Sequence, residues 1–171
     1  QYGALKRVKD FNATSTVFWQ ANAADARGQV TDATLSNGLH TVRSLDQVTG
    51  WVDYIQSGPG GGAAVQNLSY LWDRAGNLTQ RQDNNQGLTE NAYYDNLHRL
   101  DYTTLKVGAG STQTNLQLCY DNTSAGSCTK NLAGPGNISS RSDVGSGTYG
   151  SFWQYHATKK HAVTSAGFGS H

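Results

Sequence analysis

Residues 70–100 read YLWDRAGNLTQRQDNNQGLTENAYYDNLHRL, and this stretch carries the strongest structural signal in the chain. Asp73 and Gly76 bound a short connection between two segments in which apolar and polar residues alternate. An aspartate accepts the backbone N–H two residues later, and glycine adopts positive φ without a Cβ clash, so Asp-x-x-Gly is typical of a turn. Alternation with a period of two indicates strands that bury one face. The stretch therefore predicts a strand, a turn and a second strand.

The same pattern recurs along the chain. The strings at 28–31 (GQVT), 76–79 (GNLT) and 136–139 (GNIS) share the order glycine, amide, branched apolar residue, hydroxyl. Aspartates recur at intervals of a little over twenty residues, and a recurring interval of this length indicates a repeat architecture. The alternating segments that precede them end in an aromatic residue at Trp72, Tyr94 and Tyr120. The predicted repeat turns are Asp25, Gly28, Asp46, Gly50, Asp73, Gly76, Asp95, Asp121 and Gly136.

Glycine-bearing connections mark the opposite ends of the predicted hairpins. Asn37-Gly38 and the segment 83–87 (DNNQG) are typical of hairpin turns. The segment 58–62 (GPGGG) predicts a surface loop, because so many glycines weaken a strand. Between Cys119 and Gly136 the short turn is replaced by an insertion, which we expect to protrude.

Composition supports an all-β fold and narrows the function. Glu90 is the only glutamate and methionine is absent, so helix should be scarce, while 9 Tyr and 4 Trp favour a core of Tyr, Trp, Leu and Val. Lys plus Arg number 13 and Asp plus Glu 12, a balance that disfavours nucleic acid as a partner. No apolar run approaches the roughly 20 residues that span a bilayer, so membrane insertion is not expected. The charged fraction of 15% lies below the usual value of about 25%, which suits a secreted or cell-surface protein.

Cys119 and Cys128 are the only cysteines, and a hairpin-like loop between them could close a disulfide. That bond would stabilise the chain by roughly 2 to 3 kcal/mol and would require an oxidising compartment. The alternative is that both cysteines are small unpaired core residues.

With these residues in view, the sequence resembles the YD-repeat family, also called Rhs (rearrangement hotspot) repeats, of bacterial wall-associated and toxin proteins and teneurins. Tyr94-Asp95 is the dipeptide that names the family, Tyr120-Asp121 repeats it, and Leu45-Asp46 and Trp72-Asp73 are variants. The resemblance covers most of residues 20–167, including the tail segment 160–165 (KHAVTS).

This resemblance implies consecutive antiparallel β-hairpins in one curled, spiralling sheet that forms a shell. The 171 residues would supply a stretch of shell wall rather than a closed container. We therefore expect residues 1–171 to be a single YD-repeat domain and a piece of a longer repeat protein. The self-cleavage and toxicity of larger relatives are not carried over, because their motifs are not found in this sequence.

No residue pattern predicts catalysis, a metal site or a cofactor. Thr164-Ser165-Ala166-Gly167 lacks the first glycine of a nucleophile elbow, and the five histidines do not show metal-ligand spacing. The aspartates fall at turn positions, so an enzyme with converging carboxylates is the least favoured interpretation.

The leading prediction is a non-enzymatic, extracellular structural scaffold that associates with itself, or with the remaining repeats of a longer chain, through its sheet edges. The alternative is a carbohydrate-binding or adhesive module, because exposed indole rings stack on sugars. Its candidate glycan-stacking residues are Trp19, Trp51 and Trp153, whereas Trp72 ends an alternating apolar face and is expected to be buried.

Overall fold

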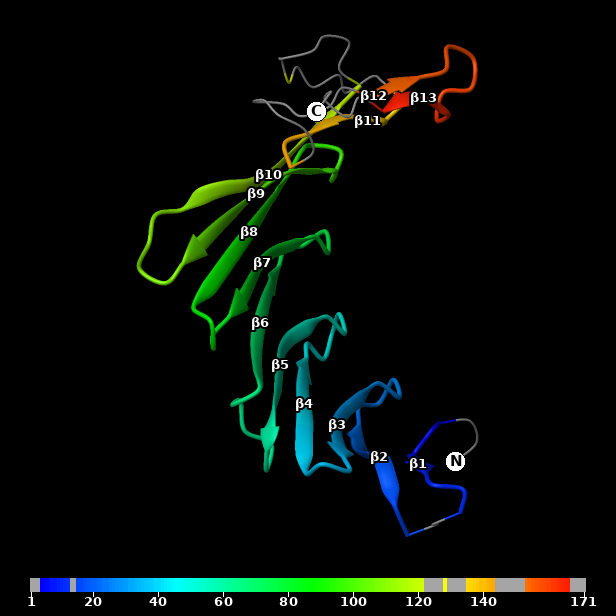
Figure 1. The fold of residues 1–171 in the computed structure, drawn as a ribbon, viewed down its shortest axis with the longest axis vertical. Coiled ribbons are helices and arrows are strands. Elements are labelled where there is room, and N and C mark those ends of the chain that lie inside the picture. Colours follow the sequence, from blue (N-terminus) through cyan, green and yellow to red (C-terminus); the bar gives the residue numbers. More distant parts are fainter. Residues whose placement is uncertain (1–3, 13–14, 122–127, 129–134, 144–152, 167–171) are drawn as a thin grey trace. The chain divides into compact units, whose positions relative to one another are not determined.

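The computed structural model describes residues 4–12, 15–121, 128, 135–143 and 153–166. These residues form consecutive antiparallel strands in a large sheet, without a helix among them, which confirms the all-β prediction (Figure 1). The chain forms two compact units, Gln1–Thr89 and Glu90–His171.

The first unit orders its strands as they follow in the chain, each antiparallel to the one before. Strand β8 (Leu88–Tyr94) begins at the end of this unit. The preceding strands are β1 (Arg7–Lys9), β2 (Val17–Ala24), β3 (Val30–Leu35), β4 (Leu39–Leu45), β5 (Val52–Pro59), β6 (Gln66–Trp72) and β7 (Leu78–Asp83).

The second unit continues with β9 (Leu100–Val107), β10 (Gln113–Tyr120) and β11 (Ile138–Arg141), again in chain order. A separate two-stranded sheet follows, made of β12 (Trp153–Tyr155) and β13 (Val163–Ala166).

A β-bulge recurs at one position of these hairpins. The register shifts immediately before the last strand residue, between Leu71 and Trp72 for example, and Trp72 then pairs with Leu78. Equivalent shifts precede Ala24, Leu45, Tyr120 and Tyr155. A bulge bends the strand and increases its right-handed twist, so each hairpin turns its last residue in the same way.

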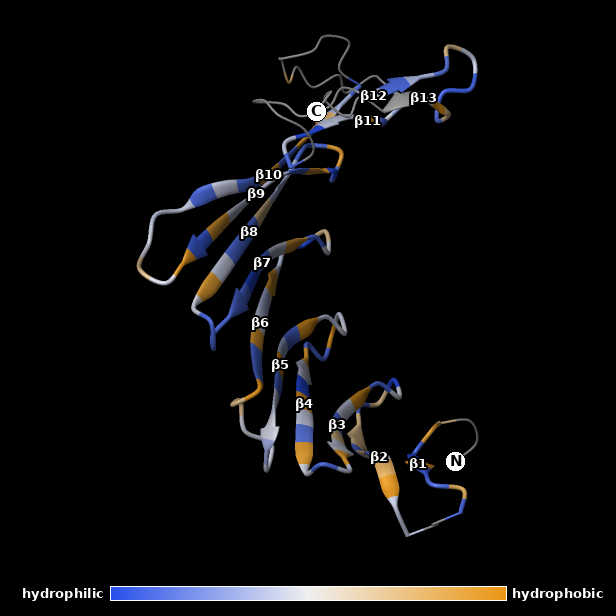
Figure 2. Ribbon diagram, viewed as in Figure 1, coloured by the Kyte–Doolittle hydropathy of each residue, from blue (hydrophilic) through white to orange (hydrophobic). Residues whose placement is uncertain are grey.

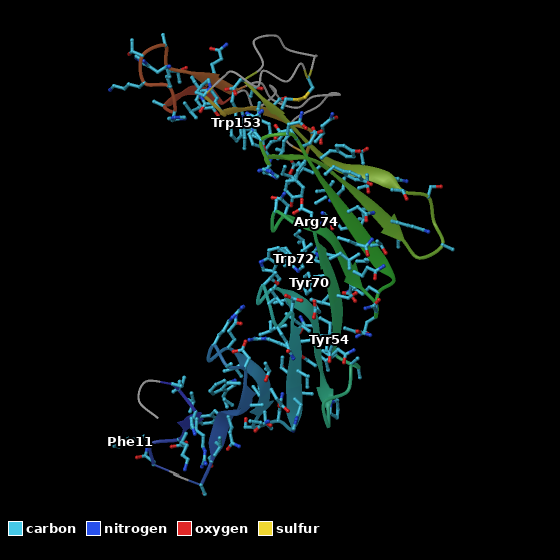
Figure 3. All side chains as sticks on the ribbon, turned by 180° about the vertical axis from the view of Figure 1, so that it is seen from behind. Phe11, Tyr54, Tyr70, Trp72, Arg74 and Trp153 are labelled. Carbon is cyan, nitrogen blue, oxygen red and sulfur yellow. A yellow bond between two sulfur atoms is a disulfide. The ribbon has the colours of Figure 1, made fainter. Side chains whose placement is uncertain are left out.

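The predicted alternation is visible along β6 as apolar and polar segments in succession, whereas β7 is polar after Leu78 (Figure 2). Leu68 pairs with Asp83, and Tyr70 pairs with Arg81, so these apolar residues share a face with charged partners. Tyr70 and Trp72 both project from β6 in Figure 3. Trp72 is half-buried rather than buried as expected.

The core is smaller and more polar than the composition predicts. The buried apolar residues of the described chain are Ala33, Leu118, Cys119 and Tyr120. All four tryptophans are half-buried, so the expected Tyr, Trp, Leu and Val core is wrong in its extent. In a single sheet, an aromatic ring is covered by the neighbouring hairpins, but no second layer packs on its outer face. Hydroxyl and carboxyl groups share the interior: Ser57, Asp101, Thr103, Thr104, Ser139 and Ser140.

The loop expected at 58–62 begins later than predicted. Gly58 and Pro59 are the last residues of β5, and only Gly60 and Gly61 form the turn that follows. Gly58 is buried, and a Cβ there would lie 2.5 Å from the carbonyl oxygen of Gly62. Glycine is therefore required in the strand because the returning backbone passes so closely. Most of the expected insertion, 122–127 and 129–134, lies outside the described residues.

Candidate functional site

The most regular feature of the molecule is a carboxylate-capped turn, which the hairpin at Asp73 shows in full. The Asp73 N–H donates to the Asn77 carbonyl at 3.0 Å, and the Gly76 N–H donates to the Asp73 carbonyl at 3.2 Å. Asp73 Oδ1 accepts the N–H groups of Ala75 and Asn77, both at 2.9 Å. One carboxylate thus satisfies two backbone donors that the strand ladder leaves over.

Asp25 and Asp46 begin turns of the same type, which we call Asp turns together with those at Asp73, Asp95 and Asp121. Asp25 Oδ1 accepts the N–H groups of Arg27 at 3.0 Å and Gln29 at 2.8 Å. The turn at Asp46 is one residue longer, and its carboxylate accepts the N–H of Thr49 at 2.6 Å. Hydrogen bonds from the Thr49 N–H and hydroxyl hold the pKa of Asp46 below its ordinary value of 3.8.

The Asp turn at Asp95 carries His98 where the others carry glycine. His98 adopts a φ of 58°, and its N–H donates to the Asp95 carbonyl at 2.9 Å. Positive φ is uncommon for a side chain with a Cβ, and histidine tolerates it better than branched residues do.

The turn at Asp121 accommodates the insertion without losing the cap. Asp121 Oδ2 accepts the Gly136 N–H at 2.8 Å, and Oδ1 accepts the Asn137 N–H at 3.0 Å. The Asp121 N–H in turn donates to the Asn137 carbonyl at 2.9 Å. Gly136, 15 positions after the aspartate, therefore occupies the place that Gly76 occupies three positions after Asp73.

The insertion is also tied to β10 by a disulfide. Cys119 and Cys128 are bonded, with their Cα atoms 5.4 Å apart, which confirms the predicted pairing. Cys119 is 1% exposed, although both its neighbours in β10 are buried as well. The one-sided alternation expected at the end of this strand is therefore wrong, because the disulfide covers the second face.

Side chains connect each Asp turn to the next one within a unit. A guanidinium N–H of Arg27 donates to the Val48 carbonyl, and the same guanidinium occupies the place where a Cβ of Gly50 would lie. Trp51 covers Gly76 in the same way, since a Cβ at Gly76 would lie 3.0 Å from its ring. Glycine is thus needed at these turns both for positive φ and for space.

Arg99 makes the corresponding connection in the second unit through charge. Its guanidinium contacts Asp95 at 2.8 Å and Asp121 at 3.4 Å, and both carboxylate side chains are only 4% exposed. It also lies 4.3 Å from the ring centroid of Tyr120. Burial alone would raise the pKa of Asp95, but the N–H and guanidinium of Arg99 outweigh it and hold that pKa below its ordinary value. Burial raises the pKa of the Tyr120 hydroxyl, partly offset by the charge of Arg99.

The bulged aromatic residue before the turn adds a third connection. Trp72 Nε1 donates to the Val52 carbonyl at 2.9 Å, and Tyr120 Oη donates to the Leu100 carbonyl at 2.8 Å. Val52 and Leu100 are the first strand residues after the preceding Asp turns. Tyr155 repeats the contact with the Ile138 carbonyl at 2.7 Å. In these three hairpins an aromatic residue with an N–H or O–H donor therefore joins one hairpin to the previous one.

His156 takes the place of the aspartate in the last hairpin. The ring nitrogen Nδ1 of His156 lies 3.2 Å from the backbone nitrogens of both Thr158 and Lys159. The backbone N–H of His156 donates to the Ala162 carbonyl at 2.8 Å. Neither this role nor those of Arg27 and Arg99 were predicted from the sequence.

One face of the first unit carries a row of polar side chains that the sequence analysis also missed. Gln56 Nε2 donates to Asn67 Oδ1 at 3.4 Å, Ser69 Oγ to Gln82 Oε1 at 3.3 Å, and Gln82 Nε2 to Thr89 Oγ1 at 3.4 Å. The pairing of Gln56 with Asn67 and of Ser69 with Gln82 places them on one face. Gln80 and Gln82, two positions apart in β7, were the available signal.

The candidate glycan-stacking tryptophans lie in separate environments. Trp19 pairs across β1 and β2 with Val8, Trp51 packs against Trp72 with ring centroids 5.8 Å apart, and Trp153 begins β12. All three are half-buried, and Trp153 Nε1 is buried without a hydrogen-bond partner. Trp19 and Trp51 belong to the first unit and Trp153 to the second.

Within the described ranges, no three His, Cys, Asp or Glu side chains gather where they could hold a metal ion. No helix in that part of the chain has the length and apolarity to cross a membrane. Neither the family models nor the curated proteins compared with the chain gave a match.

Proposed function

We propose that this chain is a non-enzymatic structural scaffold, a stretch of YD-repeat wall that is secreted or displayed at a cell surface. The observation that supports it best is the repetition of one capped, bulged turn whose side chains connect it to the next turn. Arg27, Trp51 and Arg99 each contact the following Asp turn. Two of these side chains are charged and one is apolar, but all three have the same role. In an enzyme we would expect such charged groups to converge on a cleft. In this chain the guanidinium of Arg27 binds a backbone carbonyl instead, and that of Arg99 binds two turn carboxylates.

The YD dipeptide gains a physical meaning in this proposal. Its aspartate caps the turn, as at Asp121, and its aromatic residue donates to the preceding hairpin, as Tyr120 does to the Leu100 carbonyl. The bulge before the aromatic residue adds twist at every repeat, and twist of one hand accumulates along a sheet. A longer array of the same repeats would curl into the spiral wall that the resemblance implies.

We propose that further strands add to the wall at β1, the edge strand of the sheet. Arg7, Val8 and Lys9 of β1 are exposed, and among the described strands β1 pairs with β2 alone. The Lys6 carbonyl accepts the Ala21 N–H. Because backbone groups alternate along a strand, the N–H of the next residue, Arg7, is directed away from β2. Open edges of this kind recruit further strands.

Sedimentation velocity of the full chain over a range of concentrations tests this function. We expect reversible association that Arg7→Pro abolishes, because proline removes the outward donor, and that Arg7→Ala preserves, because it removes only the side chain. A monomer at every concentration, or equal association of the two variants, would contradict the edge as the building surface. The carbohydrate-binding alternative receives less support, since one face of Trp51 already covers Gly76.

A further inference from the structure

Two tryptophans fill the space between the Asp turns at Asp46 and Asp73. Their ring centroids lie 5.8 Å apart with the planes tilted by 36°. Trp51 covers Gly76, and Trp72 donates to the Val52 carbonyl. Each ring therefore has a defined task in joining two hairpins.

The first hairpin has an alanine where the second of these rings would lie. Ala24 follows a register shift and pairs with Val30, just as Trp72 follows a register shift and pairs with Leu78. Ala24 is thus the structural counterpart of Trp72. Its methyl group can neither reach the preceding strand nor donate a hydrogen bond.

The counterpart of the first ring is an alanine as well. Tyr54 of β5 pairs with Ser69, and Trp51 lies three positions before Tyr54. Arg7 of β1 pairs with Gln20 of β2, which is the counterpart of Ser69. Ala4 lies three positions before Arg7. Both large rings are therefore replaced by methyl groups at this interface.

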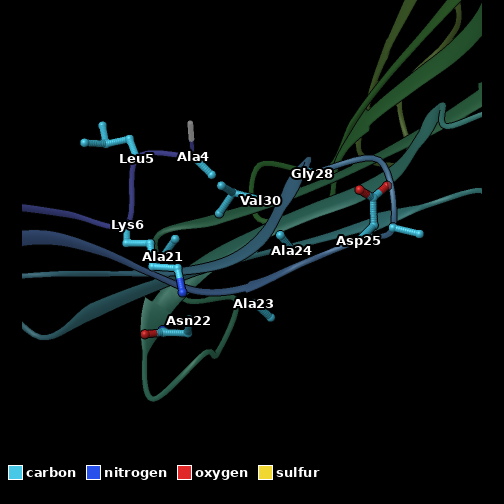
Figure 4. Close-up of a pocket in the computed structure, with 11 residues that line it drawn as sticks. Ala4, Leu5, Lys6, Ala21, Asn22, Ala23, Ala24, Asp25, Gly28 and Val30 are labelled. Carbon is cyan, nitrogen blue, oxygen red and sulfur yellow. The ribbon is translucent and has the colours of Figure 1, made fainter. Parts of the chain in front are cut away.

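A hollow of about 400 Å³ occupies the vacated space (Figure 4). A Cβ at Gly28 would meet nothing within 4 Å, whereas a Cβ at the equivalent Gly76 would meet Trp51 at 3.0 Å. Leu5, the counterpart of Val52, and Lys6 also line the hollow. The small residues that line it are Ala4, Ala21, Ala23, Ala24, Ala26 and Gly28.

We propose that this hollow binds a planar aromatic ring that carries an N–H or O–H donor, of the indole or phenol class. The ring replaces the missing pair of side chains, and its donor bonds the backbone carbonyl of Leu5, as Trp72 bonds that of Val52. Burial of an aromatic face against alanines supplies the main driving force. The ammonium of Lys6 adds an attraction to the ring face. The inference does not depend on the proposed scaffold function.

Titration of the full ¹⁵N-labelled chain with indole, followed by amide NMR, tests the site. We expect saturable shifts at Ala21, Ala24, Gly28 and Val30. Indene, a bicyclic ring of the same size that lacks the donor, should bind roughly five- to tenfold more weakly, in line with the net contribution of one hydrogen bond. A glycine-flanked tryptophan peptide forms a second arm: saturable shifts with it identify a polypeptide side chain as a ligand, and shifts with indole alone identify a free small molecule.

Ala24→Trp is the decisive variant, because its own ring fills the hollow. Indole binding should be lost while the unfolding temperature rises. Ala24→Leu fills the space partly and serves if the tryptophan variant does not fold. Ala109→Trp, at an exposed loop position, is the matched control and should bind indole normally. Absence of saturable shifts in the unmodified chain, or unchanged binding in Ala24→Trp and Ala24→Leu, would overturn the proposal.

Discussion

The indole of Trp51 lies against Gly76, so closely that a Cβ on this glycine would be 3.0 Å from the ring. Gly76 also adopts a φ of 89°, a conformation that residues with a Cβ rarely occupy. Two independent requirements therefore meet at one position, one local and one imposed by the preceding repeat.

Gly76→Ala should consequently destabilise the chain more than Gly28→Ala does. Gly28 has a similar φ of 82° but open space around it, so only backbone strain of about 1 kcal/mol applies there. At Gly76 the displaced indole adds to the strain, and we expect a loss of about 2 to 3 kcal/mol. Urea unfolding of the two variants measures the difference. Gly76→Ala should cost less stability in a Trp51→Ala background than in the unmodified chain. Equal losses for the two glycines would contradict the contact.

Arg99→Met should be among the most damaging single changes in the second unit. It leaves the carboxylates of Asp95 and Asp121 nearly buried without their cation, and breaking such a pair costs about 3 kcal/mol. We also expect the pKa of Asp95 to rise, because the guanidinium that lowers it is gone. Carboxyl ¹³C NMR titration measures the rise. Arg141→Met, which breaks an exposed pair with Asp143, is the control and should change stability little.

The cap at Asp46 predicts a loss of stability in acid. Its folded-state pKa lies below the ordinary 3.8, so the contribution is present above about pH 4 and is lost as the pH falls through the folded-state pKa. Asp46→Asn keeps an acceptor for the Thr49 N–H but does not titrate. The stability of the unmodified chain should therefore fall relative to Asp46→Asn as the pH drops below about 4 in urea unfolding. Parallel curves for the two proteins would show that the carboxylate is not bonded as described.

His156 should be replaceable by aspartate but not by alanine. Its Nδ1 accepts two backbone N–H groups, a task that the carboxylates of the Asp turns perform elsewhere in the chain. His156→Ala removes the acceptor and should weaken the β12–β13 hairpin by about 1 kcal/mol, which accelerates amide exchange at Ala162. His156→Asp should restore slow exchange. Equal exchange in both variants would argue against a capping role.

Local chemistry made the turns and strands predictable from the sequence, whereas the contacts between repeats were not. The alternating segment that ends at Trp72 became β6 because its pattern acts within a few residues. The contact between Arg27 and Val48 joins residues 21 positions apart, and only the stacking of hairpins brings them together. Gly58 shows the same limit, since its place in β5 depends on how closely Gly62 returns. Ala4 and Ala24 could not be singled out from the sequence. The hollow beside them becomes evident only when the structure shows that Trp51 and Trp72 occupy the equivalent positions of another hairpin.

The repeating cap is tested most directly by amide hydrogen exchange at the residues that close the Asp turns. Four turns are compared: three of the common length, and the one at Asp121 that contains the insertion. The N–H groups of Gln29, Asn77, Arg99 and Asn137 each donate to a turn aspartate. All four should exchange on the order of a hundredfold or more slower than in an unstructured peptide. Exchange at the unstructured rate in any of them would contradict a single repeated turn.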